Sequence, residues 1–164
     1  MTQADSNALP APHYGLITTE ILKQYSGVDL LTGMMQGRLP MAPITRELGM
    51  RIVEVEKGRV VFQSTPELRF YNPLGSVHGG FLATMLDSAM ACAIHSTLDA
   101  GIGYTTIEFK ITFLRPVTDQ TGPVRAEGKI ISVGRRVGAS EGSLLDAGGK
   151  VLAHATTSCL IFPL

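Results

Sequence analysis

Apolar and polar residues alternate along much of the second half of the chain. Residues 106–113 place Ile or Phe at every second position between Thr, Glu and Lys, and residues 124–130 repeat the alternation. A period of two with one apolar face is typical of half-buried antiparallel strands. The pattern predicts six strands, two of them within residues 48–65 around a turn at 56–58, and the others at 106–113, 124–130, 140–145 and 150–162, the last two joined by a turn at 146–149.

One long helix is predicted between the second and third of these strands, over residues 79–98. The segment is rich in Ala, Met and Leu and is apolar on nearly all sides. A helix of this kind must be surrounded by other elements. One sheet can surround it only by curling around it, unless a second copy covers the far side. We therefore predict a two-layer α+β domain whose sheet wraps on one helix and which associates with itself.

The first 45 residues follow neither pattern. Residues 1–15 are rich in Ala, Pro, Ser and Asn and predict a flexible arm. Residues 16–45 predict a helical extension, with a short amphipathic helix over 17–25 and an apolar cluster over 30–35 interrupted by glycines. The domain of sheet and long helix is then expected to span residues 46–164.

Composition supports self-association and excludes several functions. The 164 residues carry 14 basic and 14 acidic side chains, and only 17% of residues are charged, against about 25% in a typical soluble domain. A chain of zero net charge has no overall attraction to nucleic acid or to an anionic membrane. The N-terminus lacks the basic start and apolar run of a secretory signal. The most apolar stretch, residues 79–97, falls short of the about 20 apolar residues of a membrane span and carries a carboxylate.

The two cysteines, Cys92 and Cys159, lie far apart in apolar surroundings, and neither has a CxxC partner. This arrangement predicts two reduced core residues in a cytoplasmic protein rather than a disulfide scaffold. Cys92 and His95 are three positions apart, but nothing completes a metal site. Neither a metal ion nor a separate cofactor is expected.

Asp87 is the single charged residue within the predicted helix 79–98. Burying a carboxylate costs free energy unless it is paired or protonated, and no Lys or Arg lies one helical turn away. Ala83 and Ala91 flank it at four-residue spacing and leave room for another group to approach. A carboxylate in such a place is a candidate catalytic group. The alternative is that Asp87 faces solvent or bonds to a nearby backbone or hydroxyl group.

The segment before this helix, residues 72–80, reads Asn-Pro-Leu-Gly-Ser-Val-His-Gly-Gly. Glycine allows a ligand to approach the backbone closely, and the first N–H groups of a helix are unpaired donors with a partial positive charge. Gly79 and Gly80 could therefore polarise a carbonyl oxygen as an oxyanion hole does. The alternative is an ordinary transition from loop to helix.

The combination of Asn72, the His-Gly-Gly at 78–80, Asp87 and a later strand ending in Phe-Leu-Arg-Pro-Val resembles the hotdog-fold thioesterases. It is most similar to the phenylacetate-pathway (PaaI-like) subgroup of the 4-hydroxybenzoyl-CoA thioesterase superfamily. The resemblance implies a hotdog fold over residues 46–164, in which an antiparallel sheet wraps around a long central helix, here with an extra N-terminal helix. It also implies an acyl-CoA thioesterase that forms a homodimer or homotetramer, with active sites where two protomers join.

The resemblance further implies roles for individual residues. Asp87 matches the family's nucleophile or general base, supplied across the interface, and Gly79 matches the glycine whose N–H polarises the thioester carbonyl. Asn72 and His78 match residues that position the thioester or its water. Thr106 matches a Ser or Thr that contacts the acid, the preceding threonine being the alternative. A thiol has a pKa of about 8.5 and leaves easily as a thiolate, so an acid and oxyanion donors suffice without a metal.

Coenzyme A is expected only as part of the substrate. Arg135 and Arg136, between two glycines, and Arg115, at a strand end, are the candidates to bind its phosphates; solvated surface arginines are the alternative. The apolar cluster at 30–35 could line an acyl pocket because Met adapts to varied ligands. Packing of a peripheral helix is the preferred interpretation.

Two other functions stay open. A hotdog enoyl-CoA hydratase or dehydratase would use a His with an acid on a differently spaced motif near a Pro-Gly segment, and the chain lacks that motif. A non-catalytic acyl-CoA-binding module would have no need of Asp87. The expected partners are acyl-CoA and a second copy of the chain, with no nucleic acid and no membrane.

Overall fold

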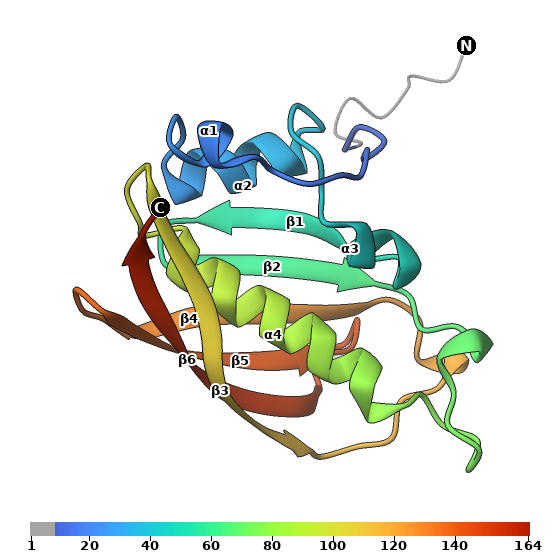
Figure 1. Ribbon diagram of the computed structural model, residues 1–164. Helices are drawn as coiled ribbons and strands as arrows, with labels where there is room; N and C mark the ends of the chain where they lie inside the picture. Colours follow the sequence, from blue (N-terminus) through green and yellow to red (C-terminus); the bar gives the residue numbers. More distant parts are fainter. Residues whose placement is uncertain (1–8) are drawn as a thin grey trace.

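A six-stranded antiparallel sheet curls around one long helix in the computed structural model, which describes residues 9–164 (Figure 1). The helix is α4 (Gly79–His95). The strands are β1 (Arg51–Glu56), β2 (Arg59–Ser64), β3 (Ile102–Phe113), β4 (Val124–Val133), β5 (Val137–Leu145) and β6 (Val151–Pro163), in the order β1-β2-β4-β5-β6-β3. The predicted α+β architecture, a sheet wrapped on a helix, is confirmed.

The sheet approaches α4 most closely where two glycines face each other. Gly128 of β4 pairs with Gly142 of β5, and a Cβ added at Gly128 would lie 2.3 Å from the carbonyl oxygen of Ala89 on the helix. Ser140 of β5 donates a hydrogen bond of 3.0 Å to the carbonyl oxygen of Met90. The missing side chains therefore let the helix backbone rest directly on the sheet.

A bulge in β3 changes which residues of that strand face the helix. The register with β6 shifts between Thr106 and Glu108, and Ile107 between them is 57% exposed. Beyond the bulge, Phe109 and Ile111 pack against the core. The predicted alternation is thus right for these two residues and wrong for Ile107, because one extra residue reverses the inward and outward sequence.

Three short helices precede the sheet: α1 (Thr19–Leu22), α2 (Gly27–Met35) and α3 (Pro43–Glu47). The helix predicted at 17–25 is reduced to the four residues of α1. The longest helix of the extension is α2, which contains Gly27 and Gly33, where the sequence predicted an interruption. Ser26 caps α2 by accepting from the N–H of Asp29 at 3.3 Å. A Cβ on Gly27 would lie 1.7 Å from the carbonyl oxygen of His95, so this glycine allows contact with α4 rather than ending a helix.

Residues 13–15 run alongside Met41, with the Gly15 N–H donating to the Met41 carbonyl oxygen at 3.0 Å. The remainder of the predicted flexible arm falls in part on residues 1–8, outside the described residues. Two short 3-10 turns, η1 (Leu68–Phe70) and η2 (Asp119–Thr121), complete the described chain. No helix in residues 9–164 is long and apolar enough to cross a membrane.

The two edges of the sheet have different surroundings. Helices α1 and α2 lie beside β1, whereas β3 has β6 on one side and no strand of residues 9–164 on the other (Figure 1). Ile107 and Phe113 of β3 are both more than half exposed. A long edge strand with exposed apolar residues is suited to pairing with another strand.

Candidate active site

Asp87 lies on the stripe of α4 that faces away from the sheet. The opposite face of the helix is fully buried, whereas this stripe combines small and polar residues of low or intermediate exposure: Ala83, Thr84, Asp87, Ser88, Ala91 and Cys92. These positions recur at spacings of three and four and therefore share one side of the helix. Within one chain the Asp87 side chain is therefore only half-buried, on the side of the helix that the sheet does not cover.

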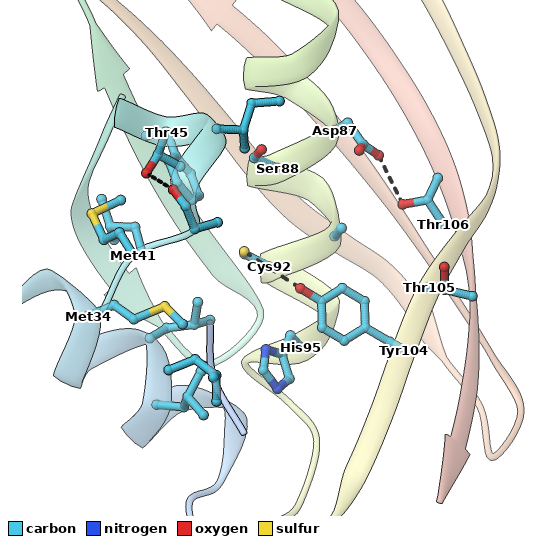
Figure 2. A pocket seen from close by; sticks show the side chains of 18 of the residues that line it. Met34, Met41, Thr45, Asp87, Ser88, Cys92, His95, Tyr104, Thr105 and Thr106 are labelled. Atoms are coloured by element: carbon cyan, nitrogen blue, oxygen red, sulfur yellow. Dashed lines mark hydrogen bonds between the residues drawn. The ribbon is translucent and has the colours of Figure 1, made fainter. Parts of the chain in front are cut away.

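The carboxylate of Asp87 has one hydrogen-bond partner within the described chain. The Thr106 hydroxyl donates to Oδ1 of Asp87 at 2.9 Å (Figure 2). The second carboxylate oxygen has no protein donor among residues 9–164, and no Lys, Arg or His there forms an ion pair with Asp87. The sequence left Thr105 and Thr106 as alternatives. In the structure Thr106 points toward the helix and contacts Asp87. The carboxylate is thus held at one oxygen and open at the other.

Asp87 and Thr106 open into a cavity of about 440 Å³, which we name the Asp87 cavity. Its walls come from the outer stripe of α4, residues 104–106 of β3, the N-terminal extension, and one residue each of β1 and β2, Ile52 and Phe62 (Figure 2). The extension contributes mostly aliphatic side chains and methionines: Ile17, Leu22, Leu30, Leu31, Met34, Met41 and Ile44. The apolar cluster at 30–35 therefore packs the peripheral helix, as preferred, and three of its members, Leu30, Leu31 and Met34, also line this cavity.

The end of the cavity away from Asp87 holds three polar side chains that burial keeps neutral. The ring of His95 packs on that of Tyr104 with centroids 4.6 Å apart, and the Tyr104 hydroxyl lies 3.9 Å from the sulfur of Cys92. Burial raises the pKa of the Cys92 thiol to about 12 and lowers the pKa of His95 to about 4. Burial also holds the pKa of Tyr104 well above that of a free phenol. Sequence reasoning missed Tyr104, which carries no motif.

The buried His95 makes the stability of the protein depend on pH. A pKa of about 4 in the folded state, against about 6.5 when unfolded, means that the unfolded chain binds more protons between these values. The contribution to stability is complete above pH 6.5 and is lost as pH falls toward 4. We expect wild type to lose about 2 kcal/mol more of its free energy of unfolding than His95→Gln between pH 6.5 and 4.5. Urea titrations at both pH values measure this, and equal losses would contradict it.

Gly79 lies in a second depression of about 410 Å³, the Gly79 cavity, at the N-terminal end of α4. Asn72, Phe113 and Arg115 also line it. As the first residue of α4, Gly79 has an N–H without an acceptor among residues 9–164. A Cβ at this position would lie 2.8 Å from the Phe113 ring. Binding of a carbonyl oxygen here requires a free N–H donor and space beside it. Gly79 provides both, because its N–H is unpaired among the described residues and it has no side chain.

Asn72 and His78 shape the backbone around Gly79. The Asn72 side-chain oxygen accepts from the N–H of Leu74 at 2.9 Å, and its amide donates to the Ser76 hydroxyl at 3.0 Å. His78 caps α4: its Nδ1 accepts from the N–H of Gly80 at 2.8 Å. The Gly80 N–H is therefore already bonded, which leaves Gly79 as the available donor of the pair.

The candidate arginines fall in different places. The Arg115 guanidinium donates to the carbonyl oxygen of Val151 and borders the Gly79 cavity. Arg135 and Arg136 lie in the turn between β4 and β5, beside Ile102 and the end of β6, and border neither cavity. Only Arg115 is brought near another predicted site residue.

Within one chain, the carboxylate of Asp87 and the N–H of Gly79 lie far apart. Asp87 follows Gly79 by eight residues on α4, which places them about 12 Å apart along the helix, in different cavities. Thr106 is brought to Asp87, and Asn72 and Arg115 to Gly79. No group of three or more His, Cys, Asp or Glu side chains in residues 9–164 is arranged to hold a metal ion.

Comparison with known sequences assigns this architecture to a family. Residues 74–153 match the family model described as "Thioesterase superfamily". The chain is 33% identical to "Putative esterase SSO2140" of Saccharolobus solfataricus over 118 residues, which cover 72% of this chain and 82% of that protein. A protein of Halobacterium salinarum, "Putative esterase VNG_1336C", is 34% identical over 84 residues, covering 50% of this chain and 54% of its own length.

Comparison with solved structures confirms the hotdog fold. A phenylacetic acid degradation-related protein from Ralstonia eutropha is 31% identical, with a TM-score of 0.73, covering 80% of this chain and 98% of that one. The thioesterase HI1161 from Haemophilus influenzae is 19% identical, with a TM-score of 0.69, and covers 94% of this chain and 96% of its own. The PaaI protein of E. coli is 24% identical, with a TM-score of 0.67, covering 73% and 83%. The last two show the fold alone.

Proposed function

Because the chain belongs to the thioesterase superfamily and is a thioester hydrolase, we propose that it hydrolyses acyl-CoA to a free acid and coenzyme A. The observation that carries the proposal is the carboxylate of Asp87, held by Thr106 and open to a cavity with apolar walls. An apolar cavity accommodates an acyl group. The thioester carbon of that group would then lie close to the Asp87 carboxylate at the border of the cavity.

Asp87 acts in this proposal as a general base. Thr106 holds Oδ1, and the free Oδ2 accepts a proton from a water molecule as the water oxygen attacks the thioester carbon. The carbonyl π electrons move onto oxygen, and they return as the C–S bond breaks. Coenzyme A leaves as a thiolate, which takes up the proton held by Asp87 or one from solvent. General-base help of this kind is worth about 10²- to 10⁴-fold in rate.

The oxyanion donor of the same site is the Gly79 N–H of a second protomer. A single chain places Gly79 about 12 Å along the helix from Asp87, too far to act on the same carbonyl group. The open edge of β3 and its exposed Ile107 and Phe113 provide a surface where two copies would continue one sheet. A twofold pair would give two equivalent sites per dimer; dimers of this kind could pair further into a tetramer.

Coenzyme A would extend from this site over the Gly79 cavity. Arg115 borders that cavity and is the candidate for its phosphates, because guanidinium groups bind phosphate oxygens bidentately. Asn72 and His78 support the loop that presents the Gly79 N–H. The free cysteines fit a reducing compartment such as the cytoplasm.

Thiol release from a panel of CoA esters tests the function. We expect the full chain to release free thiol from at least one acyl-CoA, at a rate proportional to enzyme concentration. Hydration of a trans-2-enoyl-CoA without thiol release would instead indicate the hydratase, and tight binding of intact acyl-CoA without turnover would indicate a binding module. Either result would overturn the proposal.

A further inference from the structure

We propose that the N-terminal extension forms the acyl pocket and limits the substrate to uncharged acyl groups of about eight to ten carbons; this inference rests on the proposed function. Apart from α4 and β3, the wall of the Asp87 cavity comes mainly from nine residues within 17–45, outside the sheet-and-helix domain, and Ile52 of β1 and Phe62 of β2 complete it. Leu30 and Leu31 of α2 are each 2% exposed and fix this wall, while Met34 on the same helix is only partly buried. A rigid wall with one adaptable side chain is suited to setting a length limit.

The length of the cavity follows from the helix that forms its floor. Figure 2 shows Asp87 and Thr106 at one end, and His95 and Met34 at the other. His95 follows Asp87 by eight residues, or about 12 Å at 1.5 Å per residue. Three covalent bonds of an extended chain span about 3.8 Å, so about nine bonds fill this distance. An acyl chain whose thioester carbon lies at Asp87 therefore reaches His95 with roughly its eighth to tenth carbon.

The walls also determine the charge that the acyl group can carry. Asp87 is the single charged residue among those lining the cavity, and burial keeps His95, Tyr104 and Cys92 neutral at physiological pH. A carboxylate at the far end of the acyl group would lose its hydration and meet no cation there. The cavity therefore favours a monocarboxylic acyl group over a dicarboxylic one of the same length.

Met34 offers a direct test, with Met35 as its matched control. Both methionines are partly buried and pack against the core, but Met34 also lines the cavity and Met35 does not. We expect wild-type kcat/KM to rise from acetyl-CoA to octanoyl- or decanoyl-CoA and then to fall. Met34→Trp should lower kcat/KM for decanoyl-CoA about tenfold or more and shift the optimum to shorter chains, and Met34→Ala should shift it to longer chains. Met35→Trp and Met35→Ala should keep the wild-type optimum.

The two Met34 variants change the space in opposite directions, so a folding defect in one leaves the other informative. An unchanged chain-length optimum in Met34→Ala and Met34→Trp would overturn the inference while leaving the thioesterase proposal intact. Suberyl-CoA should be hydrolysed about a hundredfold more slowly than octanoyl-CoA of equal length; equal rates would contradict the charge argument.

A binding measurement separates failure of the pocket from failure of the proposed function. If wild type hydrolyses none of the esters, the proposed function fails, and calorimetric binding of the intact esters then tests the pocket alone. Tighter binding of decanoyl-CoA than of butyryl-CoA, weakened by Met34→Trp and unaffected by Met35→Trp, supports the pocket. Absence of decanoyl-CoA binding, or equal affinity for the two esters, overturns it.

Discussion

Asp87→Asn will lower kcat for CoA ester hydrolysis by about 10²- to 10⁴-fold, the usual contribution of a general base. The amide has nearly the volume of the carboxylate and can still accept the hydrogen bond from Thr106, so the free energy of unfolding should change little. It cannot accept a proton from water. Steady-state thiol release measures the loss, and full activity of Asp87→Asn with every ester that wild type uses would exclude the mechanism.

Thr106→Val provides the graded control. The valine fills the space of threonine but leaves Oδ1 of Asp87 without its donor. Because Thr106 positions the base and does not take the proton, we expect a smaller loss of kcat than in Asp87→Asn, with KM nearly unchanged. A loss as large as that of Asp87→Asn would mean that the hydroxyl itself takes part in the reaction.

Mixed protomers test whether the site is shared between chains. Gly79→Val blocks access to the N–H donor, and Asp87→Asn removes the base. If one site uses Asp87 of one chain and Gly79 of the other, co-refolding the two inactive variants yields hybrid dimers with one intact site, and about a quarter of wild-type activity returns. Hybrids that stay inactive would place both groups in one chain.

Gly128→Ala will destabilise the protein by about 1–3 kcal/mol, the usual cost of overpacking a core. The added methyl group would lie 2.3 Å from the backbone oxygen of Ala89, and helix backbone cannot move aside as a flexible side chain can. Helix α4 would have to lift from the sheet. Urea unfolding followed by circular dichroism measures the change.

Gly134→Ala is the matched control on the loop that follows the same strand. A Cβ there has its nearest contact at 3.4 Å, with the carbonyl oxygen of Val137. Its effect should be within about 0.5 kcal/mol, as for most surface changes. Equal destabilisation by the two substitutions would show that the contact between Gly128 and α4 carries no particular strain.

The sequence predicted the layers of this fold well because each layer has its own period. Residues 79–98 are apolar on nearly all sides, and the strands alternate, so the helix and the wrapped sheet follow from elementary burial. The bulge at Ile107 was not predictable, because an extra residue leaves the composition of a strand unchanged. The start of helix α2 was not predicted for a related reason: Gly27 allows close contact with His95 on another element, and sequence alone shows only a poor helix former.

The candidate site likewise contains residues that the sequence revealed and residues that only the structure revealed. Asp87 was found because it is the one charge in an apolar helix, and Gly79 because it opens that helix. The cavity itself depends on tertiary contacts: Tyr104 and Met34 carry no motif and meet only when the N-terminal extension folds against α4. The choice between Thr105 and Thr106 depended on which side chain of β3 faces the helix before the bulge. No local sequence pattern shows this.

The position of β6 has a consequence for how the chain is made. β3 pairs along its length with β6, and β6 also pairs with β5. During synthesis β3 emerges long before β6, so within the described chain the backbone of β3 has no partner strand until residues 151–163 follow. Such non-local pairing slows folding and leaves strand edges open to wrong partners. A chain truncated before Val151 would leave β3 and β5 without the strand that joins them, and we expect it to aggregate.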